Sequence, residues 1–347
     1  MNTTPRRWQQ SLRDLEREFE RLVQALDLIF ALDRQIFQTS FNLDELLNEI
    51  LKGLRDLTNA DHAQILLRRG PSLVIAHSTQ PEFDKGKEFK IEECVCGLAV
   101  EKEQTISSGD VERDYPNRYQ WVLGRNKENR MVSEIAVPIR TPTQDQLIVG
   151  VINVESPQRD AFSQHEIELV EKVALQAGVA IHNARVHEGL SLTLQLAEAI
   201  QSKRQEPREG LRSILEQLAK FFQEGVIVQF LTYDRALETL VIESSTVPST
   251  EGLSVLVSDS FSGLVIDRRT AVRSQDVPAE WPDLFKDTVG DTGHKPTQSE
   301  LAVPIIEDGI IIGVLNVESP QKGAFNSHDE YILSQIAKSA SAWKRLE

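Results

Sequence analysis

Residues 148–162 read IVGVINVESPQRDAF, and residues 311–325 read IIGVLNVESPQKGAF. Eleven of these fifteen positions are identical, at an offset of 163 residues. The match extends upstream to two further pairs of segments, 133–139 with 299–305 and 96–111 with 262–277, both at an offset of 166. The repeated unit spans about 150 residues, which is longer than the repeat of a solenoid. The sequence therefore predicts two homologous domains.

Each copy of the repeat has the same order of predicted elements. A helix with an apolar stripe comes first, at 46–57 or 211–222, and two short strands follow it. A helix led by Gly97 or Gly263 then precedes a short strand and a polar segment. Two strong strands joined by a hairpin and a last helix complete the unit. Helices that flank an antiparallel sheet predict an α+β fold for each domain.

The repeat also sets the predicted domain boundaries. They are an N-terminal helix at 1–39, a first domain at 40–187, a helical connector at 188–206 and a second domain at 207–347. The helix that starts at Ser163 is expected to continue to about Lys203, because no proline interrupts it. A continuous helix would couple the two domains mechanically, unlike a flexible linker.

Apolar residues in the segment 8–36 recur at alternating spacings of four and three. This heptad seam predicts a coiled coil or a helix bundle, and a homodimer is expected. The predicted dimerisation residues are Leu12, Leu15, Phe19, Leu22, Leu26 and Ile29. The alternative is a helix packed on its own domain, since Val23, Ala25 and Phe30 widen the apolar stripe. The pattern leaves a parallel and an antiparallel dimer equally open.

The composition excludes several classes of partner. The chain has 347 residues, with 38 Lys plus Arg against 53 Asp plus Glu, and a net charge of −15. Such an acidic surface repels phosphate backbones, so neither nucleic acid nor an anionic membrane is expected as a partner. No apolar run reaches the length of a membrane span, and acidic residues stand where a signal peptide is apolar. A cytoplasmic location is expected.

The motifs resemble those of GAF domains. They are GLAV, SEIAVPI and GVINVESP in the first copy, and GLVI, SELAVPI and GVLNVESP in the second. The resemblance covers about residues 40–187 and 207–345, nearly the whole chain. It implies a sensory or regulatory protein that binds a small molecule over one face of the sheet. It also implies dimers that pass signals along connecting helices.

A cyclic-nucleotide ligand is not expected from this resemblance. Family members that bind one carry Asn-Lys, then Phe, three residues and Asp-Glu, whereas Val154 and Val317 replace the lysine here. The segments after the phenylalanine instead have capping-box spacing: Ser163 with Glu166, and Asn326 with Asp329. These segments are therefore predicted to start helices.

Cys94 and Cys96 are the candidates for catalysis. They resemble the V-C-G of the free methionine-(R)-sulfoxide reductases, one enzyme branch of the family. That branch places its nucleophilic cysteine in the later polar segment, and residues 115–130 contain none. The second copy has Ser260 and Ser262 at these positions. Two structural thiols are therefore expected, with no catalytic residue, and no metal site because a second Cys/His pair at ligand spacing is lacking.

A ligand pocket is expected under the polar segment of each domain, as the resemblance implies. The predicted ligand-binding residues of the first domain are Asp110, Arg118, Tyr119, Trp121, Ser133 and Glu134. Those of the second are Asp276, Trp281, Phe285, Ser299 and Glu300. Aromatic walls with a few polar groups suit a small molecule, although the same aromatics would also close the core beneath the loop. The first domain has more cations here and is preferred for an anionic ligand.

Three functions remain open. The preferred one is a dimeric tandem GAF sensor that signals to an output domain or partner outside this chain. The second is a ligand-free dimerisation scaffold, with both pockets filled by side chains. The third is a reductase-like enzyme that uses Cys94 or Cys96, although no known catalytic motif supports it. The sequence leaves the ligand, any cofactor, the binding domain and the output partner unknown.

Overall fold

The computed structural model describes residue 23 and residues 42–58, 60–118, 130–144, 146–201, 207–222, 225–284 and 295–340. The chain divides into two compact units, with the boundary between Ala184 and Arg185. This boundary lies inside helix α6 (Gln164–Gln201), so the predicted continuous helix is confirmed. All six predicted dimerisation residues of the N-terminal segment lie outside the described residues.

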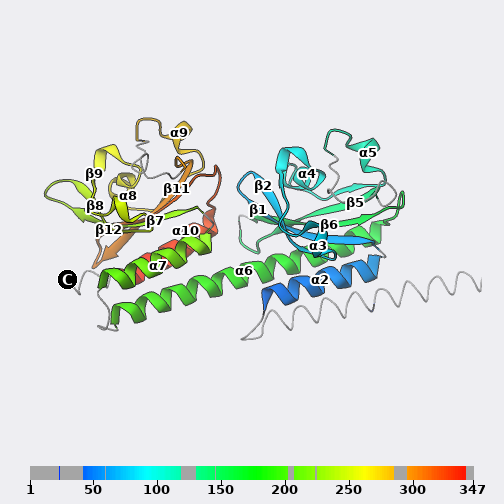
Figure 1. Cartoon of the computed structure of the whole chain (residues 1–347), viewed down its shortest axis with the longest axis horizontal. Helices are drawn as coiled ribbons and strands as arrows, with labels where there is room; N and C mark the ends of the chain where they lie inside the picture. The colour runs from blue at the N-terminus through cyan, green and yellow to red at the C-terminus, as the bar shows by residue number, and fades with distance from the viewer. Residues whose placement is uncertain are drawn as a thin grey trace, which may run out of the picture. The chain divides into compact units, whose positions relative to one another are not determined.

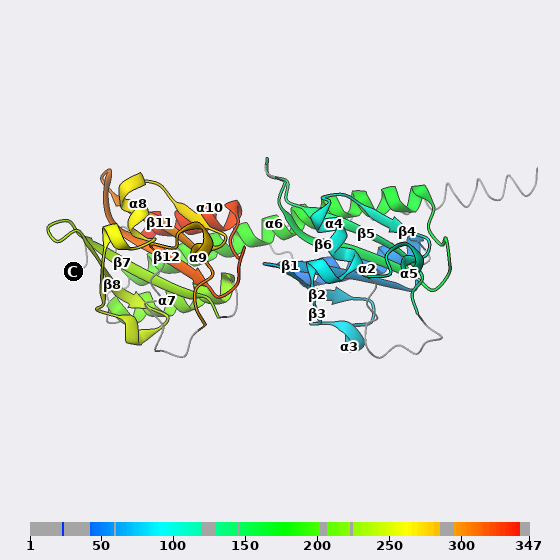
Figure 2. The same ribbon diagram turned by 90° about the horizontal axis from the view of Figure 1, so that it is seen from above.

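The first unit is built on a six-stranded antiparallel sheet in the order β3-β2-β1-β6-β5-β4 (Figure 2). Its strands are β1 (His62–Arg69), β2 (Ser72–Ser78), β3 (Glu88–Lys90), β4 (Ile106–Ser108), β5 (Ser133–Arg140) and β6 (Ile148–Ser156). The predicted β5–β6 hairpin forms, and β6 also pairs with β1. The repeated sequence therefore supplies the central strands of the sheet.

Helices lie on both faces of this sheet (Figure 1). They are α2 (Leu43–Thr58), α3 (Pro81–Asp84), η1 (Ile91–Glu93), α4 (Val95–Glu101), α5 (Val111–Asp114) and the first part of α6. On the face of α2 and α6, Leu47 and Ile50 are buried against Ile65 and Ile152 of the strands. Each such side chain contributes about 1.5–3 kcal/mol relative to an exposed one. Helix α4 lies over the opposite face.

The second unit repeats this plan, with strand order β10-β11-β12-β7-β8-β9. Its strands are β7 (Ile227–Asp234), β8 (Thr239–Ser245), β9 (Ser254–Leu256), β10 (Val272–Ser274), β11 (Ser299–Glu307) and β12 (Ile310–Ser319). Its helices are α7 (Pro207–Phe222), η3 (Pro248–Thr250), η4 (Val257–Asp259), α8 (Gly263–Arg268), α9 (Val277–Glu280) and α10 (Ser327–Ala340). Leu218 of α7 and Leu333 of α10 pack on one face, while α8 lies over the other. Both units thus have the predicted α+β fold.

Both predicted capping boxes form, one at the start of α6 and one at the start of α10. Before α6, the Ser163 backbone N–H donates to Glu166 Oε2 at 2.7 Å, and the Glu166 N–H donates to Ser163 Oγ at 3.4 Å. Before α10, Asn326 and Asp329 exchange the same pair of bonds at 3.0 and 3.1 Å. The segments that replace the cyclic-nucleotide signature therefore start helices, as predicted.

Candidate functional site

A cavity of about 50 Å³ lies in the second unit, on the sheet face that α8 covers. It is lined by Gln229, Leu231, Ile242, Val255, Asp259, Ser260, Phe261, Ser262, Leu284, Thr297, Glu300, Asn316 and Glu318. Strand side chains alternate between faces, so Gln229 and Leu231 point here while Val228 and Phe230 join the core under α7. The volume holds a few water molecules or a small polar group.

Two buried carboxyl groups form one side of the cavity. Glu300 on β11 and Glu318 on β12 are paired across the two strands, and each is only 8% exposed. Ser262 Oγ donates to Glu300 Oε1 at 3.4 Å, and Thr297 Oγ1 donates to Glu318 Oε2 at 2.6 Å. Burial, and then the nearby Glu318 charge, raise the pKa of Glu300 well above its usual range. Burial and the neighbouring carboxyl group therefore both disfavour the ionised form of Glu300.

An amide pair beside the carboxyl groups leaves hydrogen-bonding capacity unused. Asn316 Nδ2 donates to Gln229 Oε1 at 3.4 Å and to Glu318 Oε1 at 3.1 Å. Gln229 Nε2 and Asn316 Oδ1 are buried and have no hydrogen-bond partner among the described residues. Each such group costs about 1–3 kcal/mol when it is left unpaired. The cavity thus presents one unmatched donor and one unmatched acceptor.

The first unit carries the same polar row on its β1, β5 and β6 strands. Asn153 Nδ2 donates to Gln64 Oε1 at 3.4 Å, and Glu134 is paired with Glu155 across β5 and β6. Burial, and then the Glu155 charge, raise the pKa of Glu134 to about 8. A fully buried His62 contacts Glu155 Oε2 through Nδ1 at 2.7 Å. The carboxyl pair of this copy is therefore in contact with a base of the chain itself.

The two cysteines also lie over the polar row of the first unit. Cys94 Sγ accepts from the Gly97 N–H at 3.3 Å and so caps α4, while Cys96 Sγ donates to Glu134 Oε1 at 3.5 Å. Burial raises the pKa of Cys94 to about 11 and that of Cys96 well above its usual range. Both groups are therefore thiols at neutral pH, which opposes nucleophilic chemistry.

We expect both thiols to react with a maleimide at least on the order of 100-fold more slowly in the native protein than in urea, because burial limits access and disfavours the thiolate. Mass spectrometry of timed samples at pH 7.5 measures the labelling of Cys94 and Cys96. A Cys96→Ser variant has the residue that the second unit carries at the equivalent position, Ser262. Its labelling rate belongs to Cys94 alone, so the two rates of the native protein can be assigned. Fast labelling of either thiol in the native protein would contradict the buried placement.

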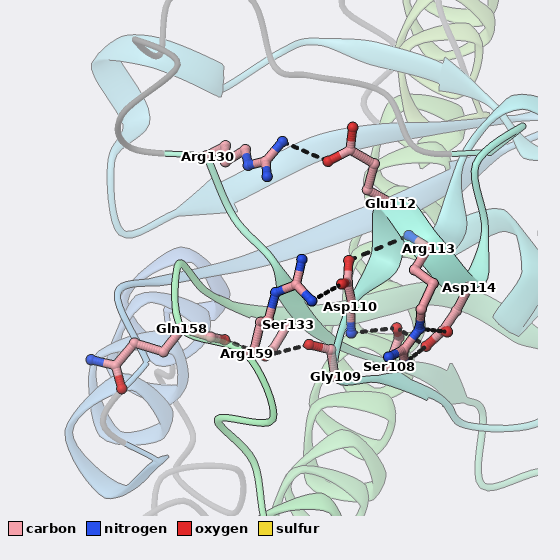
Figure 3. Close-up of polar contacts among 10 residues, drawn as sticks. All are labelled: Ser108, Gly109, Asp110, Glu112, Arg113, Asp114, Arg130, Ser133, Gln158 and Arg159. Carbon is pink, nitrogen blue, oxygen red and sulfur yellow. Dashed lines mark hydrogen bonds and ion pairs between the residues drawn. The ribbon is translucent and has the colours of Figure 1, made fainter.

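Asp110 and Ser133, two of the predicted ligand residues, instead hold loops of the first unit together (Figure 3). Asp110 accepts from the Arg113 N–H at 3.3 Å and pairs with Arg159 Nη1 at 2.8 Å. Ser133 Oγ donates to the carbonyl oxygens of Gln158 and Gly109. These contacts fix the segment after β6 against the segment before α5.

Their counterparts in the second unit behave alike. Asp276 pairs with Lys322 Nζ at 2.6 Å, and Ser299 Oγ donates to the Gln321 carbonyl at 2.7 Å. Trp281 packs edge-to-face on Phe261, with ring centroids 6.4 Å apart, and the Arg268 guanidinium lies 5.0 Å from its ring centroid. Trp281 therefore packs behind the cavity wall that Phe261 forms.

The remaining predicted residues divide into two groups. Arg118 makes a bidentate ion pair with Glu101, at 3.1 and 3.0 Å, and donates to the Ile91 carbonyl at 3.2 Å. It therefore ties the segment after α5 to the end of α4. Tyr119, Trp121 and Phe285 lie outside the described residues.

Of the predicted ligand residues that the structure describes, only Glu134 and Glu300 take part in the two polar rows. Sequence reasoning missed the residues His62, Gln64, Asn153, Glu155, Gln229, Asn316 and Glu318. A signal was present, because the repeated NVES places its Asn and Glu two residues apart and hence on one face of a strand. A polar pair at that spacing inside an otherwise apolar strand marks a buried polar face.

The comparisons place the chain in the GAF domain family. The GAF domain family model matches residues 42–182 and 205–342, which together make up most of the sequence. The chain therefore belongs to this family and contains two GAF domains, the first and second units described above. Among the helices of the described residues, none is long and apolar enough to cross a membrane.

Similarity to individual proteins is more limited. The chain is 48% identical to Protein YtsP of Bacillus subtilis (strain 168) over 42 residues, which span 12% of this chain and 26% of the length of that curated relative. The GAF domain of an Acinetobacter phosphoenolpyruvate-protein phosphotransferase is 18% identical, with 48% of this chain and 95% of that chain covered and a TM-score of 0.40. The Neisseria meningitidis free methionine-R-sulfoxide reductase, solved with its substrate, is 20% identical, with 46% and 92% covered and a TM-score of 0.37.

Proposed function

We propose that this chain is a sensory tandem GAF protein whose second domain binds a small polar molecule. The observation that carries the proposal is the amide pair in the second-domain cavity. Gln229 and Asn316 are each 2% exposed, and each lacks one hydrogen bond among the described residues. Buried polar groups are almost always satisfied, so a donor and an acceptor left open toward a cavity favour a ligand there.

The first domain has a different part in this proposal. His62 bonds Glu155 through Nδ1 and Ser78 through Nε2, and the Cys96 thiol bonds Glu134. These contacts favour a structural role for the polar row of the first domain. The scaffold alternative expects such a role in both domains, and here it is proposed for the first domain alone. The pairing of Arg118 with Glu101 also lowers its capacity to bind an anionic ligand.

The signal is proposed to leave the chain through its helices. Helix α6 belongs to both units, so a change at its second-domain end acts on one continuous element. A homodimer formed through the N-terminal seam, with an output domain or partner outside this chain, completes the proposal. Ligand control then requires that the ligand bind two helix arrangements with different affinity.

An enzymatic role has less support. The two thiols have raised pKa values because they are buried, and the smaller opposing effects of the Gly97 N–H and of Arg118 on Cys94 do not offset that burial. Burial, and then the charge of the neighbouring Glu134, disfavour a thiolate at Cys96 and raise the pKa of its thiol well above the usual range. A protein without catalysis therefore accounts better for the described residues.

Native mass spectrometry of the purified full chain tests this function. The expected result is a dimer that carries a defined small molecule, which denaturing conditions release. A Gln229→Leu/Asn316→Leu variant should lose the molecule, because both open groups are replaced by apolar ones of similar size. A Gln64→Leu/Asn153→Leu variant is the matched control in the first domain and should keep it. Retention of the molecule by the first variant would contradict the proposed site.

A further inference from the structure

The two amide side chains of the second-domain cavity are held in fixed orientations. Asn316 Nδ2 donates to Glu318 Oε1 at 3.1 Å and to Gln229 Oε1 at 3.4 Å. Turning the Asn316 amide over would replace the N–H donor to Glu318 by an oxygen, which opposes that orientation. The other two amide atoms, Asn316 Oδ1 and Gln229 Nε2, are buried without a hydrogen-bond partner among the described residues. The open pair is therefore one acceptor and one donor.

The two open atoms lie close enough for one small ligand to reach both. The nitrogen and oxygen of an amide are about 2.3 Å apart, so the 3.4 Å contact between Asn316 and Gln229 keeps the open atoms within about 8 Å of each other. A single amide group with a hydrogen bond of about 2.9 Å at each end spans a similar distance. The cavity of about 50 Å³ that both side chains line holds a group of that size.

The chemistry of the open pair selects a ligand that both donates and accepts. Both oxygens of Glu318 already accept from the chain, from Asn316 Nδ2 at 3.1 Å and from Thr297 Oγ1 at 2.6 Å. An anionic acceptor would satisfy Gln229 but would place a second acceptor against the Asn316 oxygen. A group with donors alone would satisfy Asn316 and leave Gln229 unmatched. A neutral amide carries both kinds of group and matches the pair.

The first domain differs in this respect. Asn153 and Gln64 make the same 3.4 Å contact, and Asn153 Oδ1 is likewise buried without a partner among the described residues. The Gln64 side chain makes a further interaction, and its nitrogen is not among these open groups. Within the described part of the chain, the second domain is therefore the one whose amide pair leaves a donor and an acceptor open together.

We infer that the second-domain cavity binds a neutral amide group, as in a primary carboxamide, a lactam or a urea. An N–H of the ligand donates to Asn316 Oδ1, and its carbonyl oxygen accepts from Gln229 Nε2. The ligand thereby completes the hydrogen bonds of both buried side chains. This inference rests on the proposed function and adds the chemical class of the ligand and the two contacts that select it.

Three probes of the same planar shape separate donors from acceptors: acetamide, acetone and acetamidinium. Acetamide both donates and accepts, acetone only accepts, and acetamidinium only donates. Saturation-transfer NMR on their methyl signals, at constant ionic strength and pH 7.5, measures the affinity of each for the dialysed full chain. Acetamide is expected to bind at least about tenfold more tightly than the other two, because each of them leaves one open group unmatched.

Gln229→Met removes the open donor and keeps the length of the side chain. It should weaken acetamide and acetone severalfold and leave acetamidinium nearly unchanged, because only a carbonyl oxygen loses its partner. Gln64→Met makes the same change at the equivalent position of the first domain and should leave all three affinities unchanged. The ranking of the probes on the wild-type chain does not depend on the folding of either variant.

Acetone or acetamidinium binding as tightly as acetamide would overturn the inference and leave the proposed function standing. Loss of acetamide binding in Gln64→Met would overturn it too, because the binding site would then lie in the first domain. Binding of none of the three probes would also overturn it, as would a retained native ligand without an amide group. An empty protein in native mass spectrometry would instead contradict the proposed function itself.

Discussion

A Gly97→Ala variant is expected to destabilise the first domain by about 3 kcal/mol or more. An added Cβ atom would lie 1.8 Å from the carbonyl oxygen of Ile91, far inside van der Waals contact. Because the colliding atom belongs to the backbone, no side-chain rotation relieves the overlap, and either α4 or η1 must move. That movement would displace Cys94 and Cys96 from the polar row that they cover.

Hydrogen exchange resolved by peptide measures this effect in each domain separately. Gly263→Ala should reproduce it in the second domain, where the Cβ would lie 1.9 Å from the Val257 carbonyl oxygen. Gly252→Ala is the control, since nothing lies within 4 Å of its Cβ. Its φ of +80° alone should cost about 1–2 kcal/mol. Unchanged protection of the first domain in Gly97→Ala would contradict the close approach of α4 and η1.

The fold was predictable because several local signals agree in both copies. The repeat defines the two domains and the central β5–β6 and β11–β12 hairpins, and apolar spacing places α2 and α7. Capping residues such as Ser163 and Glu166 mark helix starts from neighbouring positions in the chain. These features depend on short stretches of sequence, and tertiary packing preserved each of them.

The site was less predictable because it depends on which sheet face each polar residue occupies. Asn153 and Glu155 stand in the very stretch that defines the repeat, yet the burial of Asn153 depends on α4, which covers that face (Figure 1). Arg118 is a plausible ligand residue from its loop position, but its partner Glu101 lies 17 residues away in the chain. Ser133 bonds the carbonyls of Gly109 and Gln158, which lie 24 and 25 residues away in the chain. Asp110 pairs with Arg159, which is farther still along the chain. Distant pairings of this kind leave no spacing signal.

An isosteric Glu134→Gln variant is expected to make the first domain more stable than wild type at pH 8, on the order of a few kcal/mol, and to have little effect near pH 4. The folded-state pKa is about 8, because burial and Glu155 disfavour the charged form. In the unfolded chain a glutamate has a pKa of about 4.3. Between these values only the unfolded state ionises, so the wild-type free energy of unfolding falls as pH rises and levels off above the folded pKa. Glutamine cannot ionise, so the variant escapes this loss.

The hydrogen bond from Cys96 should survive this substitution, because the glutamine side chain keeps an oxygen that accepts from the thiol. The change in stability therefore reports the charge of Glu134 and not a lost contact. Hydrogen exchange of first-domain peptides from pH 4 to pH 9, corrected for intrinsic rates, measures it, with the exposed Glu92→Gln as the matched control. A difference that stayed constant with pH would mean that Glu134 does not titrate on folding. A variant destabilised at pH 8 would mean that the carboxylate of Glu134 is stabilised in the fold, and the raised pKa of Glu134 would then be wrong.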